Sequence, residues 1–167
     1  MSDNVVYKIV SNATIAAIYF VVTYLSTPIA FGQIQIRIAE ALILLCFFRR
    51  DYWIGLTLGC LLSNLTSPLG WPDIVFGTGA TLISSLLVAY ASPCLLIAVA
   101  YPVIANAFVV GAELYFILEL PFWVNVAYVG AGELVAVSLG YAFFMIMKRR
   151  KGFLPALKAE RHLDFKF

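Results

Sequence analysis

Charged residues are scarce in this chain of 167 residues, because Asp, Glu, Lys and Arg make up only 12% of it whereas 63% is hydrophobic. Soluble domains contain about a quarter charged residues and about half apolar ones. The composition therefore excludes a soluble domain and indicates a surface that faces lipid. The net charge is only +2, and no stripe of basic residues is present, so nucleic acid is excluded as a partner.

Motifs of the common enzyme classes are also lacking. The chain has no G-x-x-x-x-G-K-[ST] loop for ATP phosphates, no H-E-x-x-H and no G-x-S-x-G, and its single histidine, His162, lies in the tail. Hydrolysis by a pair of intramembrane acids would need a second Asp in an adjacent apolar run, and none is present. The three cysteines, Cys46, Cys60 and Cys94, lie in or beside apolar runs, which favours small buried side chains over a disulfide or metal site. We expect no catalytic residue, metal or cofactor.

Long apolar runs dominate what is present. At roughly 20 residues per transmembrane helix, the length holds about six spans. The sequence predicts an all-α integral membrane bundle of six transmembrane helices within residues 1–147, followed by a basic cytoplasmic tail, 148–167. The predicted spans are 9–26, 34–48, 53–64, 73–90, 94–118 and 121–147.

The basic residues predict the orientation of this bundle. Of the 11 Lys and Arg residues, all except Arg37 lie before the first run, in the short loop at Arg49 and Arg50, or after the last run. Six spans place these three segments on one side, and the positive-inside rule makes that side cytoplasmic, with both termini. The plasma membrane is the expected location. Five spans, with 53–64 re-entrant, would separate the Arg-rich loop from the tail.

Small residues recur every four positions in several runs, a pattern that marks close helix contacts in lipid. Most of these positions are expected to pack inside the bundle. The first helix, however, has no charged residue between Ile9 and Ser26, so Ala13 and Ala17 also suit docking of another membrane subunit. The four sets are Ala13 and Ala17; Gly55, Gly59 and Ser63; Gly77, Thr81, Ser85 and Ala89; and Gly132, Ala136 and Gly140.

Six ionisable side chains lie in or beside the predicted spans. A charge is costly there, so each of these residues is a candidate functional residue. They are Arg37, Glu40, Asp73, Glu113, Glu119 and Glu133. The predicted topology places the first five toward the external face, and Glu133 ~18 Å into the last span at 1.5 Å per residue. Together they can line one outward-opening cavity.

Each of these residues also has a purely structural interpretation. Arg37 and Glu40 are spaced i, i+3 and can pair with each other, Asp73 can cap a helix that follows Trp71, and Glu119 can be solvated at the rim. Glu113 and Glu133 have no basic residue within one or two helical turns. A buried carboxylate without a partner is protonated, hydrogen-bonded or used to bind a ligand, so these two residues favour ligand or proton handling.

An acidic cavity selects the chemistry of its ligand. Carboxylates accept N–H donors well, and the amides Asn106 and Asn125 add donors and acceptors. A flat heterocycle with N–H donors or a positive amine fits such a cavity. An anion does not, because only Arg37 could pair with its negative charge. The predicted outer loops 27–33 and 65–72 are rich in Pro, Gly and aromatic residues and either cap the cavity or simply connect helices. The aromatic residues available for its rim are Phe31, Trp71, Phe76, Tyr115, Trp123 and Tyr128.

Five stretches of the sequence resemble the QueT family of small membrane proteins. They are 31–42 (FGQIQIRIAEAL), 54–65 (IGLTLGCLLSNL), 73–84 (DIVFGTGATLIS), 102–114 (PVIANAFVVGAEL) and 130–141 (GAGELVAVSLGY). The resemblance covers residues 9–147, and F-G-x-I-Q-x-R-I-x-E-A-L followed by D-I-V-F-G is far more specific than a hydropathy match.

The resemblance implies a substrate-binding S component of an energy-coupling factor (ECF) transporter. Such a six-helix subunit works with a transmembrane coupling subunit and two cytoplasmic ATPases, and it commonly presents Ala-x-x-x-Ala on its first helix, as Ala13 and Ala17 do here. The implied substrate is a queuosine precursor, a deazapurine with N–H donors and, in one form, an ammonium arm. The substrate-binding residues that we expect are Arg37, Glu40, Trp71, Asp73, Asn106, Glu113 and Glu133.

Alternatives remain open at this stage. Hydroxymethylpyrimidine or a pyridoxine-type vitamin precursor presents a similar flat face with N–H donors. Two other functions are an autonomous proton-coupled carrier that uses Glu113 and Glu133, and an intramembrane enzyme. Copurification with ATPase subunits distinguishes the importer subunit from both.

Overall fold

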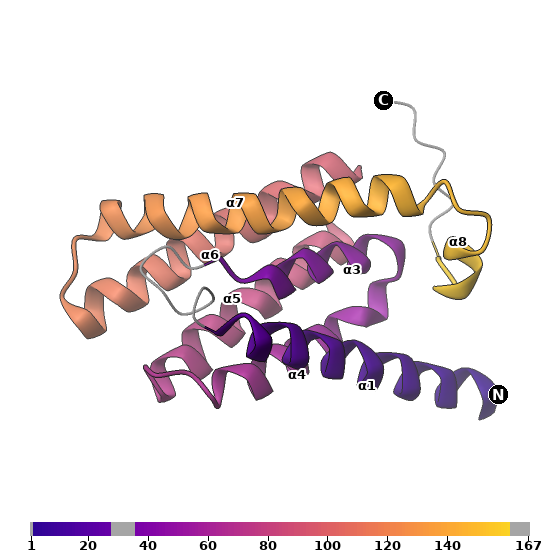
Figure 1. Ribbon diagram of the computed structural model, residues 1–167, viewed down its shortest axis with the longest axis horizontal. Helices are drawn as coiled ribbons and strands as arrows, with labels where there is room; N and C mark the ends of the chain where they lie inside the picture. Colours follow the sequence, from indigo (N-terminus) through magenta and orange to yellow (C-terminus); the bar gives the residue numbers. More distant parts are fainter. Residues whose placement is uncertain (1, 28–35, 161–167) are drawn as a thin grey trace.

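The regular structure of this chain is helical. The computed structural model describes residues 2–27 and 36–160, and each regular element in these ranges is a helix, as the all-α prediction requires. Helices satisfy their backbone N–H and C=O groups internally, which is the requirement that lipid imposes on a spanning segment. The elements are α1 (Ser2–Leu25), the 3₁₀ helix η1 (Ile38–Leu44), α3 (Leu45–Phe48), the 3₁₀ helix η2 (Arg50–Tyr52), α4 (Trp53–Asn64), α5 (Trp71–Tyr90), α6 (Leu95–Leu118), α7 (Phe122–Met147) and α8 (Phe153–Ala156) (Figure 1).

Four helices in the described part of the chain are long and apolar enough to cross a membrane. They lie at Asn4–Leu25, Trp71–Tyr90, Leu95–Leu118 and Phe122–Met147, and segments of 20 to 26 residues are roughly 30 to 39 Å long. The other two predicted spans are represented by Ile38–Phe48 and by α4, which has 12 residues. A helix of that length reaches only ~18 Å, so six crossings stay a prediction.

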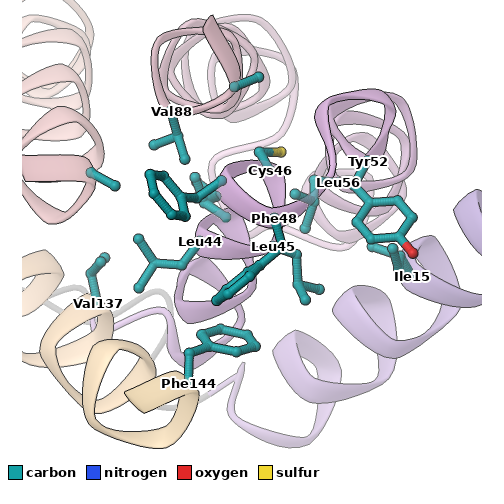
Figure 2. Close-up of a cluster of buried hydrophobic side chains, with 14 of the residues drawn as sticks. Ile15, Leu44, Leu45, Cys46, Phe48, Tyr52, Leu56, Val88, Val137 and Phe144 are labelled. Atoms are coloured by element: carbon teal, nitrogen blue, oxygen red, sulfur yellow. The ribbon is translucent and has the colours of Figure 1, made fainter. Parts of the chain in front are cut away.

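The short segment Ile38–Phe48 forms the centre of the bundle. Its η1 part contacts α1, α4, α5, α6 and α7. Figure 2 shows Leu44 and Phe48 on this central segment, with Val88 of α5 and Phe144 of α7 among the side chains around it. An apolar helix without a polar face is typically buried, and here the surrounding helices bury most of the segment, although Ile38 at its start is 42% exposed.

Glycines allow α1 and α4 to pack closely. A Cβ atom at Gly55 would lie 2.5 Å from the backbone oxygen of Asn12, and one at Gly59 would lie 2.7 Å from Cβ of Tyr19. The backbone N–H of Gly55 donates to Oδ1 of Asn12 at 2.7 Å. Since Gly55 is in the first turn of α4, α1 thereby supplies a partner for a helix N–H that has none within its own helix. The predicted internal packing is confirmed for this set of small residues.

The segments that carry basic residues gather at one end of the molecule. The N-terminus and α8 lie there together (Figure 1). The hydroxyl of Tyr7 donates to the carbonyl of Ala156 at 2.9 Å, and the hydroxyl of Tyr52 donates to the carbonyl of Leu157 at 3.0 Å. Apolar side chains that follow α7, including Phe153, pack against the core. The tail is therefore docked on the bundle as far as residue 160.

Candidate functional site

A polar cavity opens between η1, α6 and α7. The part of it that the centre of a water-sized sphere can occupy is about 10 Å³, and the wider free space of about 260 Å³ includes open solvent. Four of the seven residues predicted to bind substrate line it, together with two valines. The lining residues are Arg37, Glu40, Asn106, Val110, Val129 and Glu133.

Arg37 and Glu40 enter the cavity from the start of η1. Arg37 immediately precedes this helix, Nη1 of Arg37 is 3.9 Å from Oε1 of Glu40, and both side chains are buried. The predicted i, i+3 pair is therefore present, and both of its members also line the cavity. Nη1 of Arg37 also donates to Sγ of Cys60 at 3.5 Å. Pairing reduces the cost of keeping these charges in an apolar interior.

Glu40 is held by two hydroxyl groups from other helices. Tyr19 of α1 donates its O–H to Oε1 of Glu40, and Thr81 of α5 donates to the same oxygen at 3.0 Å. The second oxygen, Oε2, is buried and accepts no hydrogen bond from the described residues. The sequence pattern does not single out Tyr19 as a functional residue, and it predicts Thr81 only as a small packing residue. The one available signal was that Asn12, Tyr19 and Thr23 share a face of this helix.

Glu133 of α7 and Asn106 of α6 lie near each other in the cavity wall. Only 3% of Glu133 and 5% of Asn106 are exposed. The two side chains are close enough to interact, but their geometry is not that of a hydrogen bond, and Oε1 of Glu133 and Nδ2 of Asn106 have no partner within residues 2–27 and 36–160. Buried groups of this kind are costly unless something binds them. A ligand with both a donor and an acceptor satisfies the pair.

Asp73 and Glu113 form a second acidic pair, outside the lining of this cavity. Both are 1% exposed and near enough to interact. Asp73 is the third residue of α5, which follows Gly70 as its N-cap, so the interpretation of Asp73 as the N-cap is wrong. Its carboxylate instead accepts a hydrogen bond from the hydroxyl of Ser67. Neither carboxylate oxygen of Glu113 has a hydrogen-bond partner in the described part of the chain.

Aromatic residues do not line the described cavity wall. Trp71, predicted to bind substrate, is 64% exposed at the start of α5, and Trp123 is 72% exposed at the start of α7. Such positions suit the membrane–water interface, where amphipathic rings are enriched. Val110 and Val129 occupy the wall instead, and Phe31 lies outside the described residues. Asn125 is also away from the cavity lining, and its Nδ2 donates to the carbonyl of Pro121 at 2.9 Å.

The predicted docking residues on α1 are accessible. Ala13 and Ala17 are exposed, whereas Asn12, Ala16 and Tyr19 on the other side of the same helix are buried. These two small side chains therefore lie on the exposed side of α1, beside larger exposed residues such as Val10 and Ile18. Glu119, the residue expected at the rim, is exposed at the end of α6.

The chain is similar to known membrane transport proteins over most of its length. The model of the QueT transporter family matches residues 9–149. The chain is 29% identical, over 164 aligned residues, to the queuosine precursor transporter QueT of Lactococcus lactis subsp. cremoris (strain MG1363), and the alignment covers 87% of this chain and 94% of that relative. No solved structure matches the chain.

Proposed function

Because this chain belongs to the QueT transporter family, we propose that it is a membrane transport protein that binds a queuosine precursor in the cavity between η1, α6 and α7. The name of the Lactococcus relative supports this substrate. The observation that carries the site assignment is the buried carboxylate of Glu133, which lines the cavity and whose Oε1 has no hydrogen-bond donor among the described residues.

The charges of the cavity select the ligand. Arg37 contributes one positive charge, and Glu40 and Glu133 contribute two carboxylates. With both carboxylates ionised, the cavity has an excess of one negative charge, which favours a cation or a donor-rich ring over an anion. A deazapurine with an ammonium arm presents N–H donors to the carboxylates and a ring acceptor to Asn106. We propose that Asp73 and Glu113 form a second acidic position for the arm, and that Trp71 contacts ligand only during entry.

The protein acts, in this proposal, as the substrate-binding S component of an ECF importer in the plasma membrane. The sequence has no phosphate-binding loop for ATP, so the energy is supplied by two cytoplasmic ATPases through a transmembrane coupling subunit. Ala13 and Ala17 dock that subunit, because small exposed residues let helices approach closely. The bundle of residues 1–147 crosses the membrane six times, and both termini and the basic segment 148–167 are cytoplasmic.

A second function is favoured by one observation. Glu113 is buried beside Asp73, and both of its carboxylate oxygens are without hydrogen-bond partners among the described residues. Such a pair suits a proton relay in a carrier that is driven by an ion gradient. In that case no ATPase is needed, and the acidic pair loads and releases a proton during each transport cycle.

Native mass spectrometry of the purified protein tests the proposed function. The protein is measured alone and then with the deazapurine precursors, hydroxymethylpyrimidine and pyridoxine. We expect a one-to-one complex with the deazapurine that carries the ammonium arm, and weaker or absent complexes with the two vitamin precursors. Preferential binding of either vitamin precursor would overturn the substrate assignment. Affinity purification from native membranes tests the partners, and recovery of no ATPase subunit under conditions that preserve substrate binding favours the carrier.

A further inference from the structure

Glu40 receives hydrogen bonds from two helices that do not themselves line the cavity. Tyr19 reaches it from α1, and Thr81 reaches it from α5. Both hydroxyls donate to Oε1, and Tyr19 and Thr81 are fully buried. The three side chains connect α1, η1 and α5 at the level of the cavity wall.

The two carboxylate oxygens of Glu40 have different hydrogen-bond partners. Oε1 accepts both hydroxyl hydrogen bonds and is also the oxygen nearest to Arg37. Oε2 accepts no hydrogen bond from the described residues, although it is buried. Glu40 therefore has one oxygen committed to the protein and one available to a donor in the cavity that it lines.

We propose that Tyr19 is a positioning residue for substrate recognition, which fixes Oε1 of Glu40 so that Oε2 is presented to an N–H donor of the ligand. This inference rests on the proposed function, since it assumes that the cavity holds the substrate. Tyr19 does not touch the ligand in this scheme and acts through Glu40. A carboxylate that is held by fixed donors loses little conformational freedom when it binds, and preorganisation of this kind increases affinity.

The packing of α1 determines how far Tyr19 reaches. Gly59 of α4 lies against Tyr19 and Ala16, and a Cβ atom added at Gly59 would be 2.7 Å from Cβ of Tyr19 and 2.9 Å from the backbone oxygen of Ala16. The absence of a side chain at Gly59 thus lets α1 approach until the Tyr19 hydroxyl meets Glu40. The same helix exposes Ala13 and Ala17 on its other side.

Titration calorimetry of the full-length protein in detergent tests this role, with the deazapurine that carries the ammonium arm as the probe. Tyr19→Phe removes one hydroxyl and keeps the ring. We expect the affinity to fall about tenfold, the lower part of the effect of a hydrogen bond to a charged group. Tyr52→Phe is the matched control, because it also removes a buried hydroxyl and one hydrogen bond, at the end where the tail docks. We expect that control to keep the parent affinity.

A double-mutant cycle separates positioning from general destabilisation. Glu40→Gln is combined with Tyr19→Phe, and the binding free energies are compared. If Tyr19 acts through Glu40, adding Tyr19→Phe to Glu40→Gln changes the affinity less than twofold. Additive losses, or parent affinity in the single Tyr19→Phe variant, would overturn the inference. Thr81→Val removes the other hydroxyl and should show the same dependence on Glu40, which provides a second test where Tyr19→Phe folds poorly.

The cycle also distinguishes failure of this inference from failure of the proposed site. Parent affinity in both Glu40→Gln and Glu133→Gln means that the cavity is not the substrate site. Weaker binding in Glu133→Gln, together with parent affinity in Tyr19→Phe, leaves the site intact and removes the role of Tyr19 alone.

Discussion

Glu40 and Glu133 line one cavity from η1 and α7, and Arg37 is the cationic side chain that lines it with them. Arg37 is paired with Glu40 at 3.9 Å. Glu133 has an oxygen without a hydrogen-bond donor in the described ranges. Because a carboxylate in an apolar interior is costly without a partner, a cationic or donor-rich ligand in this cavity would stabilise Glu133.

Glu133→Gln therefore tests the site most directly. The amide keeps the shape of the side chain but removes its negative charge, so a ligand N–H loses a charged acceptor. We expect the affinity for the ammonium-bearing deazapurine to fall by about 1.5 to 3 kcal/mol, which is about tenfold to a hundredfold. Titration calorimetry of the purified protein measures it.

The control for Glu133→Gln is Glu119→Gln. Glu119 is exposed at the end of α6, so the same change there removes a solvated charge and should leave binding unchanged. The affinity of Glu133→Gln is also measured for a deazapurine precursor without the ammonium arm. The loss of affinity for that ligand shows how much of the effect comes from contacts with the ring. Equal affinity of Glu133→Gln and the parent protein for both ligands would contradict the site assignment.

The sequence was sufficient to identify the charged members of the cavity. A charge in a membrane segment is costly, so Arg37, Glu40 and Glu133 stand out without knowledge of the fold. Tyr19 and Thr81 do not, because hydroxyl side chains are tolerated in apolar helices, and only the packing of α1 and α5 shows that both reach Glu40. Residues such as Val110 cannot be recognised as cavity lining from sequence either, since apolar side chains are also exposed on each of the long helices.

The helical class was also predictable, but the role of one segment was not. Ile38–Phe48 has the hydropathy of a spanning helix, yet five other helices contact η1, and Phe48 is fully buried. Hydropathy has the same value whether lipid or protein covers a side chain. The aromatic rim was expected because rings suit flat ligands, whereas Trp71 is largely exposed, a position equally natural for a ring at the membrane interface.

Glu113→Gln discriminates between the two proposed functions. In the importer, Glu113 contributes to binding of the ammonium arm, so we expect affinity to fall about tenfold while uptake stays independent of the proton gradient. Binding is measured by calorimetry, and uptake is measured in cells with and without an uncoupler, with ATP kept constant. Unchanged affinity combined with lost dependence of uptake on the proton gradient would identify a proton-coupled carrier instead.

Ala13→Leu combined with Ala17→Leu should separate transport from binding. The larger side chains prevent close approach of a partner helix to α1, and neither residue lines the cavity. We expect uptake in cells to be abolished and the affinity of the isolated protein to stay within about twofold of the parent value, since binding needs no partner contact in this scheme. Ala131→Leu with Ala142→Leu is the matched control, because both alanines are exposed on α7. Normal uptake with both substitutions in α1 would exclude this docking face.

Arg49→Lys should destabilise the end of the molecule where the tail docks. Nε and Nη2 of Arg49 donate to the two oxygens of Asp51 at 2.6 and 2.9 Å, and these hydrogen bonds raise the pKa of Arg49. Lysine cannot form this two-pronged contact, so we expect a loss of about 1 to 2 kcal/mol in the free energy of unfolding. Thermal unfolding in detergent measures the effect. Arg50→Lys, at an exposed neighbour, is the control, and an equal loss there would mean that the Asp51 contact contributes nothing specific.

The orientation in the membrane is testable with one introduced cysteine at a time, in a background in which Cys94 is replaced by Ser and the buried Cys46 and Cys60 are kept. Leu65→Cys reports on the connection between α4 and α5, where Leu65 is 61% exposed, and Gly152→Cys reports on the docked tail, where an added Cβ meets no atom within 4 Å. Figure 1 places the connection between α4 and α5 and the helix α8 at opposite ends of the bundle. Because basic segments stay cytoplasmic, we expect a membrane-impermeant maleimide to label Leu65→Cys in intact cells and Gly152→Cys only after permeabilisation. Labelling of Gly152→Cys in intact cells would require an odd number of crossings or the reverse orientation, and either result contradicts the six-span topology with cytoplasmic termini.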